Sequence, residues 1–198
     1  MGTRIGVFLD RDGTLNEERD FIRTPDELAL IPGAGKAVAR LNNRGIPVCV
    51  ISNQSGIARG YFTESDLVLI HERLRAELSR DGATIDRIYY CPHHPVNGID
   101  PYGRECDCRK PAPGMLKRAE TELDIDPGRS FVVGDRLVDV QTGMAVGATT
   151  ILVLTGYGRT SLDEIAKENS PPDYTAPSIV EAVDRILASI DGEREGSF

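Results

Sequence analysis

A short apolar strand runs directly into two carboxylates in Val7-Phe8-Leu9-Asp10-Arg11-Asp12-Gly13-Thr14-Leu15, near the start of this 198-residue chain. Side chains alternate between the two faces of a strand, so Asp10 and Asp12 are expected to point to one side and Arg11 to the other. Gly13 lets the backbone turn away from the sheet, and the hydroxyl of Thr14 can fix that turn. Alone, the Asp-x-Asp-Gly string is also compatible with a solvated turn.

Two carboxylates at the end of a strand are suited to phosphoryl transfer. One can attack phosphorus to give an aspartyl-phosphate, while the other protonates the leaving alkoxide and later deprotonates the attacking water. The two charges need a cation in order to lie close together. We expect Mg²⁺, because it takes oxygen ligands and bridges carboxylate and phosphate.

The rest of the chain continues the alternation of strands and helices. Apolar runs predict buried parallel strands at 5–9, 46–51, 87–90, 130–133 and 150–154. Helical patterns lie at 35–43, 64–80, 113–123, 137–146, 161–168 and 178–190, and a Thr63-x-x-Asp66 capping signal opens the second of them. This order predicts an α/β fold with a doubly wound parallel sheet. We expect one domain over residues 1–190 and a frayed polar tail over 191–198.

Composition restricts the class of partner. The net charge of −8 disfavours general nucleic-acid binding, which depends on an excess of Lys and Arg. The sequence has neither an apolar run long enough to span a membrane nor a secretory signal, so we expect no membrane partner and a cytoplasmic protein. In that reducing compartment, clustered cysteines favour metal binding over a disulfide. We also expect a monomer, since no exposed apolar stripe is evident.

Further polar clusters follow other predicted strands. In open α/β sheets ligands bind at the carboxyl ends of the strands, where Ser52-Asn53-Gln54-Ser55-Gly56 and Gly134-Asp135 both fall. The Ser52 hydroxyl, together with nearby backbone amides, can hold the oxygens of a transferring phosphoryl group. An ordinary polar loop is the alternative explanation for this segment.

Charged residues later in the chain complete the expected site. Lys110 can neutralise both Asp10 and the phosphoryl group, and Arg109 offers a guanidinium fork for a substrate phosphate. Asp135 is expected to complete the Mg²⁺ ligands with the Asp10 side chain and the Asp12 backbone carbonyl, although a helix N-cap also explains it. Asp139 would support the metal's waters or orient Lys110. We expect Mg²⁺ and Lys110 to keep Asp10 ionised, while the pKa of Asp12 is raised so that it acts as an acid.

Four parts of the sequence, taken in order, resemble the four motifs of the haloacid dehalogenase (HAD) superfamily of phosphatases. They are Asp10-Arg11-Asp12-Gly13-Thr14, Ser52, Lys110, and Gly134-Asp135 with Asp139. The resemblance covers nearly the whole chain. It implies a Rossmann-like fold with an Asp10 nucleophile, an Asp12 acid/base and an essential Mg²⁺. The spacing of the motifs leaves no room for a large cap domain, so the site is expected to be open.

A second metal site is expected in the segment 91–108. Cys91-Pro92-His93 and Cys106-Asp107-Cys108 supply three thiolates and an imidazole, which suit tetrahedral Zn²⁺ with no open position. We therefore expect a structural zinc site that positions Arg109 and Lys110. A disulfide is the rival explanation, although Cys106 and Cys108 are too close to pair comfortably. His94 is an alternative to His93, which is preferred because Cys-x-His resembles the family pattern.

The strings at 52–60, 89–95 and 106–111 resemble a zinc-loop subgroup of the superfamily, which narrows the expected substrate to a small sugar bisphosphate. This resemblance implies substrate contacts from the loop 18–21, from Arg109 and Lys110, and from the Ser52, Asn53, Gln54 and Ser55 segment. Arg59 is then a partner for the phosphate that does not react. A zinc-loop phosphatase for a different phosphate monoester is the nearest alternative, and a catalytically idle zinc-stabilised binding module is a more distant one.

Overall fold

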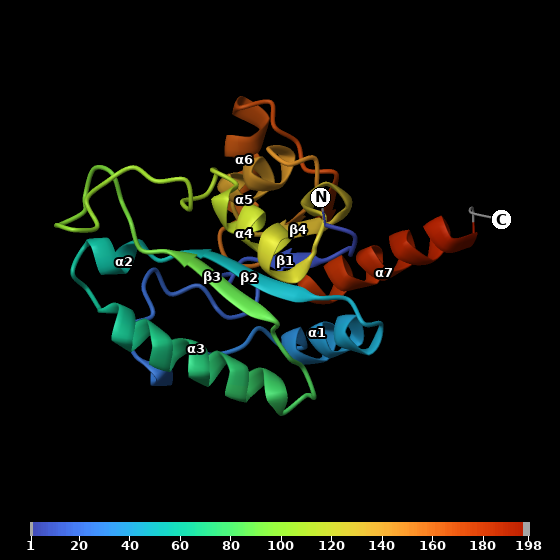
Figure 1. Cartoon of the computed structure of the whole chain (residues 1–198), viewed down its shortest axis with the longest axis horizontal. Helices are drawn as coiled ribbons and strands as arrows, with labels where there is room; N and C mark the ends of the chain where they lie inside the picture. Colours follow the sequence, from blue (N-terminus) through green and yellow to red (C-terminus); the bar gives the residue numbers. More distant parts are fainter. Residues whose placement is uncertain (1, 196–198) are drawn as a thin grey trace.

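Six parallel strands form one sheet in the computed structural model, which describes residues 2–195 (Figure 1). The strands are β1 (Val7–Leu9), β2 (Val48–Asn53), β3 (Arg87–Cys91), β4 (Phe131–Gly134), β5 (Thr149–Val153) and β6 (Tyr174–Ala176). Their order across the sheet is β3-β2-β1-β4-β5-β6. The first strand therefore lies between β2 and β4, at the point where the strand order reverses, which is where such sheets bind ligands.

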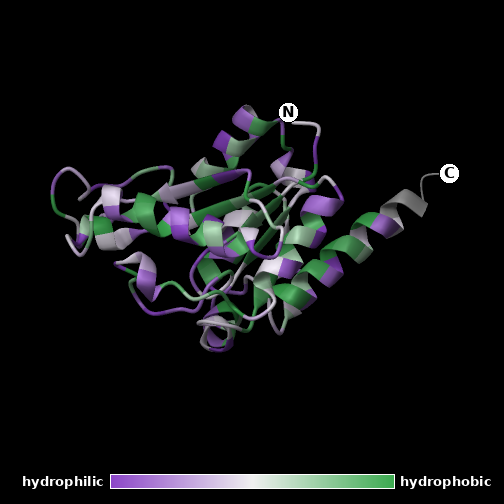
Figure 2. Cartoon of the chain, turned by 90° about the horizontal axis from the view of Figure 1, so that it is seen from below, coloured by the Kyte–Doolittle hydropathy of each residue, from purple (hydrophilic) through white to green (hydrophobic). Residues whose placement is uncertain are grey.

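Helices cover both faces of this sheet. One face carries α1 (Ala34–Asn43), α3 (Glu64–Ser79) and α7 (Ile179–Glu195), and the other carries α4 (Gly114–Leu123), α5 (Leu137–Met144) and α6 (Gly158–Lys167). Alternation along β1 explains the two layers, because Val7 and Leu9 are buried in the first core and Phe8 in the second. Figure 2 shows the apolar residues concentrated on the strands and on the inner faces of the helices. The predicted fold class is confirmed.

Short elements complete the chain, and some of them have no signal in the sequence. They are α2 (Ser55–Ala58) and the 3₁₀ turns η1 (Pro25–Glu27) and η2 (Pro127–Arg129). All five predicted strands are present, but β6 was not predicted, since three residues are too few to show a periodicity. Helix α6 begins at Gly158, three residues before the predicted start.

The expected frayed tail is wrong for residues 191–195, because α7 continues to Glu195. An ion pair between Arg44 and Asp191 links this last part of α7 to the end of α1. The remainder of the predicted tail, residues 196–198, lies outside the described residues. Among residues 2–195, no helix is both long enough and apolar enough to cross a membrane.

Candidate active site

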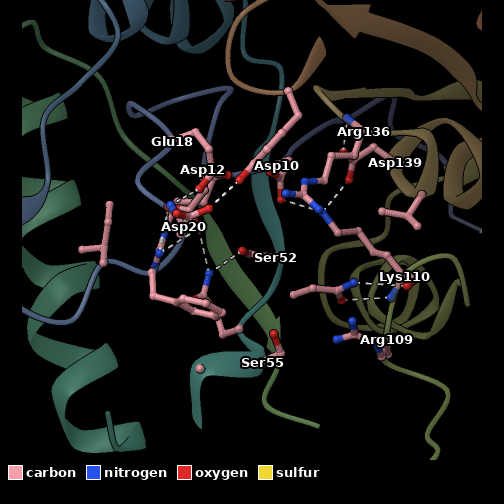
Figure 3. A pocket seen from close by; sticks show the side chains of 18 of the residues that line it. Asp10, Asp12, Glu18, Asp20, Ser52, Ser55, Arg109, Lys110, Arg136 and Asp139 are labelled. Atoms are coloured by element: carbon pink, nitrogen blue, oxygen red, sulfur yellow. Dashed lines mark hydrogen bonds and ion pairs between the residues drawn. The ribbon is translucent and has the colours of Figure 1, made fainter. Parts of the chain in front are cut away.

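The carboxyl ends of β1 and β2 and the loop after β4 surround a cavity of about 370 Å³, a size typical of small-molecule sites. Figure 3 shows its acidic and basic side chains converging from separate elements. The cavity is lined by most of the predicted site residues, namely Asp10, Asp12, Ser52, Asn53, Gln54, Ser55, Arg59, Arg109, Lys110 and Asp139. The loop 18–21 contributes Glu18, Asp20 and Phe21. The topology thus brings together predicted site residues that are up to 129 positions apart in the chain, from Asp10 to Asp139.

Lys110 is the buried cation at the centre of this site. Its Nζ donates to Asp10 Oδ1 and to Asp139 Oδ1, each at 2.5 Å, and to the backbone carbonyl of Ile51 at 2.9 Å. Burial alone would lower the pKa of Lys110, but the two carboxylates outweigh it and raise the pKa. Lys110 therefore stays charged, and Asp139 orients it, which is one of the two roles expected for Asp139.

The pKa of Asp10 is raised to about 7. Burial is the main cause, and repulsion from Asp139 and Asp12 adds to it against the attraction of Lys110. One lysine is shared between two acids, so the attraction of Lys110 is not enough to hold Asp10 at its ordinary pKa. Mg²⁺ together with Lys110 is expected to keep Asp10 ionised, and the raised pKa indicates that Lys110 alone does not suffice.

The carboxylate of Asp12 is held by three neighbouring side chains. Arg11 Nη2 donates to Asp12 Oδ2 at 2.8 Å, Asn16 donates to Oδ1 at 2.9 Å, and Gln54 donates to Oδ2 at 3.0 Å. Burial alone would raise the pKa of Asp12, but the charge of Arg11 and these donors outweigh it and lower the pKa. This corrects the expectation of a raised pKa for Asp12.

The expectation that Arg11 points away from Asp12 is also wrong. Arg11 is 1% exposed, and its guanidinium folds back over the neighbouring carboxylate. Strand β1 ends at Leu9, so the alternation of side chains does not extend to residues 10–12. On its other side, Arg11 Nη1 lies 3.4 Å from Nε2 of His71, a buried residue of α3 that the sequence analysis did not single out.

The end of β2 and the residue that follows it position other groups of the site. Asn53 and Lys110 exchange two hydrogen bonds, from Asn53 Nδ2 to the Lys110 carbonyl at 3.1 Å and from the Lys110 amide to Asn53 Oδ1 at 3.0 Å. Gln54 Nε2 donates to Ser52 Oγ at 2.7 Å as well as to Asp12. The Ser52 hydroxyl, acting as acceptor here, keeps its own proton available for a donor bond into the cavity.

Asp135 lies beside Asp10 with one oxygen in use and one unpaired. Its Oδ2 accepts from the Tyr157 amide at 2.7 Å, while Oδ1 is buried and has no hydrogen-bond partner among residues 2–195. Gly13 and Gly156 adopt positive φ values of 81° and 53°, and a Cβ at either position would collide with this carboxylate. Burial and the charges of Asp10 and Asp139 raise the pKa of Asp135 to about 8.

This arrangement fits a divalent cation. Carboxylate oxygens of Asp10, Asp135 and Asp139 lie within 4.8 Å of one another. A buried, unpaired oxygen is costly unless something binds it, and hard cations such as Mg²⁺ take oxygen ligands of this kind. The predicted Mg²⁺ ligands Asp10 and Asp135 are thus brought together, beside the turn that carries Asp12.

The predicted zinc ligands also form one cluster. The sulfur atoms of Cys91 and Cys108 each lie 3.4 Å from Cys106 Sγ, and His93 Nδ1 lies 3.7 Å from Cys91 Sγ and 3.5 Å from Cys108 Sγ. Tetrahedral Zn²⁺ with its usual bond lengths places such atoms about 3.5–3.8 Å apart. The three thiols are free, so the rival disulfide is wrong. His94 lies outside the cluster, and the structure favours His93 over it.

Tyr157 and Arg136 are cavity residues that the sequence analysis missed. Tyr157 Oη donates to Asp20 Oδ1 at 2.6 Å, and the Arg136 guanidinium lies 3.9 Å from the centre of the Tyr157 ring. Arg136 follows the Gly134-Asp135 motif directly and could have been suspected from that position. Tyr157 lies 22 residues after Asp135 in a segment with no motif, so only the fold identifies it.

Comparisons with known proteins agree with this geometry. A family model described as HAD-hydrolase-like matches residues 107–182. The chain is 44% identical to a D-glycero-β-D-manno-heptose-1,7-bisphosphate 7-phosphatase of Haemophilus ducreyi, over 83% of this chain and 90% of the relative. It is 42% identical to the Escherichia coli K12 protein of the same name, over 76% of this chain and 79% of the relative.

A solved structure is similar as well. It is that of a D,D-heptose 1,7-bisphosphate phosphatase from B. bronchiseptica in complex with magnesium and phosphate, with 34% sequence identity. The two chains align with a TM-score of 0.82 over 93% of this chain and 99% of the other.

Proposed function

Because the chain belongs to the D-glycero-β-D-manno-heptose-1,7-bisphosphate 7-phosphatase family of HAD-like hydrolases, we propose that it removes the 7-phosphate of this sugar bisphosphate. The product supplies heptose for lipopolysaccharide or other surface glycans. One observation carries the proposal most directly. Lys110 Nζ bridges Asp10 and Asp139 beside a buried, unpaired oxygen of Asp135, an arrangement suited to stabilising a phosphoryl group and its cation.

Asp10 acts as the nucleophile in the first step. One of its carboxylate oxygens forms a bond to phosphorus, and the bond from phosphorus to the sugar oxygen breaks. The Lys110 ammonium and the Ser52 hydroxyl donate to the oxygens of the transferring group, where negative charge must be accommodated. Asp139 acts indirectly in this step, because its hydrogen bond with Lys110 fixes the position of the Lys110 ammonium.

Asp12 moves the proton in both steps. Its acid form protonates the leaving sugar oxygen, and its carboxylate then takes a proton from the water that attacks the aspartyl-phosphate and releases Asp10. The donors from Arg11, Asn16 and Gln54 stabilise the carboxylate, which is the form that the second step needs. A bound phosphate dianion would oppose these donors and raise the pKa of Asp12 for the first step.

Two metals have separate roles in the proposal. Asp10, Asp135 and the backbone carbonyl of Asp12 would hold Mg²⁺, which would supply positive charge against the carboxylates and the phosphate. The HAD family uses Mg²⁺, and the B. bronchiseptica structure contains magnesium. Cys91, His93, Cys106 and Cys108 would together hold Zn²⁺, which would fix the segment that leads to Arg109 and Lys110.

The substrate assignment depends on the open cavity and its cations. Arg59 and Arg109 line the same cavity as Asp10, which provides positive charge for a second phosphate. The nearest alternative substrate is histidinol phosphate, which has only one phosphate. We further propose that the catalytic unit is a single domain and acts as a monomer.

A side-by-side turnover assay with Mg²⁺ tests this function. We expect a clearly higher kcat/KM for the heptose bisphosphate than for histidinol phosphate. Asp10→Asn should lower phosphate release from either compound by more than about 10⁴-fold, as loss of a nucleophile does. Preference for histidinol phosphate would overturn the substrate, and unchanged release by Asp10→Asn would overturn the mechanism.

A further inference from the structure

His94 is held by the turn that follows it. Its Nδ1 accepts hydrogen bonds from two backbone amides, those of Val96 at 3.3 Å and Asn97 at 3.1 Å. A ring nitrogen that accepts hydrogen bonds carries no proton, so the proton of the imidazole must be on Nε2. The tautomer of His94 is therefore fixed by its backbone partners, and Nε2 is a hydrogen-bond donor.

That donor faces another donor. His94 Nε2 lies 3.4 Å from Arg59 Nη2, and neither atom can accept a hydrogen bond in this state. Within residues 2–195 the Arg59 guanidinium donates to no oxygen, and its Nε is buried without a partner. Two polar groups that both need an acceptor thus line the same cavity.

A second cation, Arg109, is fixed beside His94 and Arg59. Arg109 Nη1 donates to the backbone carbonyl of His93 at 3.1 Å, which places the Arg109 side chain next to the start of His94. The zinc cluster holds both residues, because His94 follows the ligand His93 and Arg109 follows the ligand Cys108. In Figure 3 Arg109 and Ser55 lie on one side of the cavity, across from the acidic Glu18 and Asp20.

We propose that His94 Nε2–H and Arg59, with Arg109 beside them, form a subsite for a phosphate monoester, namely the phosphate of the substrate that is not cleaved. The oxygens of this phosphate supply the acceptors that the donors lack, and the cations balance its charge. This inference deepens the proposed function and rests on it, because it assigns His94 to recognition of the second phosphate. His94 is a specificity residue and takes no part in bond breaking.

Two replacements of His94 separate recognition from structure. His94→Asn keeps an amide oxygen near the position of Nδ1, where it can accept from the turn, and removes the donor at Nε2. His94→Gln places an amide near Nε2 and removes the acceptor for the turn. Arg104→Gln is the control, since Arg104 is an exposed cation of the same segment and does not line the cavity.

The experiment compares the heptose 1,7-bisphosphate with heptose 7-phosphate, which lacks the phosphate that is not cleaved. With the zinc- and magnesium-loaded protein, His94→Asn should raise KM for the bisphosphate about tenfold, as expected for loss of a charge-assisted hydrogen bond. The kcat for both compounds and the KM for the monophosphate should stay unchanged. His94→Gln should keep most of the preference for the bisphosphate and lower Tm, and Arg104→Gln should behave as the wild type.

The inference is overturned if His94→Asn leaves both KM values unchanged or raises them equally. It is also overturned if His94→Gln loses the preference for the bisphosphate while His94→Asn keeps it, because the turn would then be responsible. A wild-type protein that does not prefer the bisphosphate to the monophosphate contradicts the proposed substrate and this subsite together. If the wild type prefers the bisphosphate and His94→Asn shows the same KM values as the wild type, only the subsite is contradicted.

Discussion

His71 should make the stability of the protein depend on pH. It lies on α3 with 9% of its surface exposed, its Nε2 faces the Arg11 guanidinium, and its ring packs edge-on to Tyr90. Burial, followed by the charge of Arg11, lowers the pKa of His71 from 6.5 to about 3. The ring is therefore neutral in the folded protein over most of the acid range.

The sign of the effect follows from proton binding. Below pH 6.5 the unfolded chain binds a proton at His71 that the folded protein does not bind, so stability falls as the pH falls. Between pH 7 and pH 5 this one group lowers the free energy of unfolding by about 2 kcal/mol, at about 1.4 kcal/mol for each pH unit below 6.5. The loss continues until the pH approaches the folded pKa of about 3.

Urea unfolding of the wild type and His71→Gln at a series of pH values measures this contribution. The glutamine oxygen can still accept from Arg11 but does not titrate. Other titrating groups, including the zinc ligands, are common to both proteins and cancel in the difference. We expect the wild type to lose about 2 kcal/mol more than His71→Gln between pH 7 and pH 5. Parallel curves for the two proteins would refute the reasoning.

Two further substitutions test the buried cation and the zinc segment. Lys110→Met should abolish phosphate release and lower the free energy of unfolding by about 3–5 kcal/mol, because Asp10 and Asp139 lose the cation between them; a loss below about 1 kcal/mol in urea unfolding would contradict this. Cys108→Ser should lower zinc content, Tm and turnover together, since Lys110 lies two residues after the last ligand. Unchanged metal content by elemental analysis with unchanged turnover would contradict the zinc assignment.

The fold and most of the candidate site were predictable from local patterns. Apolar runs followed by Asp10, Ser52 and Asp135 are sufficient to place these residues at one edge of a parallel sheet, because the topology of such sheets is restricted. The buried stripe of α3, which includes Leu67 and Leu74, also follows from helical spacing. His71 lies on this stripe four residues after Leu67, but a polar residue does not count toward an apolar pattern, so its burial was not predicted.

Other features depend on tertiary contacts that the sequence does not display. Arg11 folds back because the strand ends before it, and the exact end of a strand is poorly marked in sequence. The pKa of Asp12 is lowered by the charge of Arg11 and by hydrogen bonds that include one from Gln54, a residue that follows a different strand. Tyr157 lies after β5 and reaches Asp20 and Asp135 only because β5 pairs with β4 in the folded sheet, so no local spacing predicts these contacts.

The raised pKa values of Asp10 and Asp135, about 7 and about 8, have a consequence for cation binding. At neutral pH a fraction of these oxygens carries protons, so Mg²⁺ and protons compete for the same atoms. Binding of Mg²⁺ therefore releases protons on average, and its apparent affinity decreases as the solution becomes more acidic. The acids that make the cavity a cation site thus couple its metal occupancy to the acidity of the surroundings.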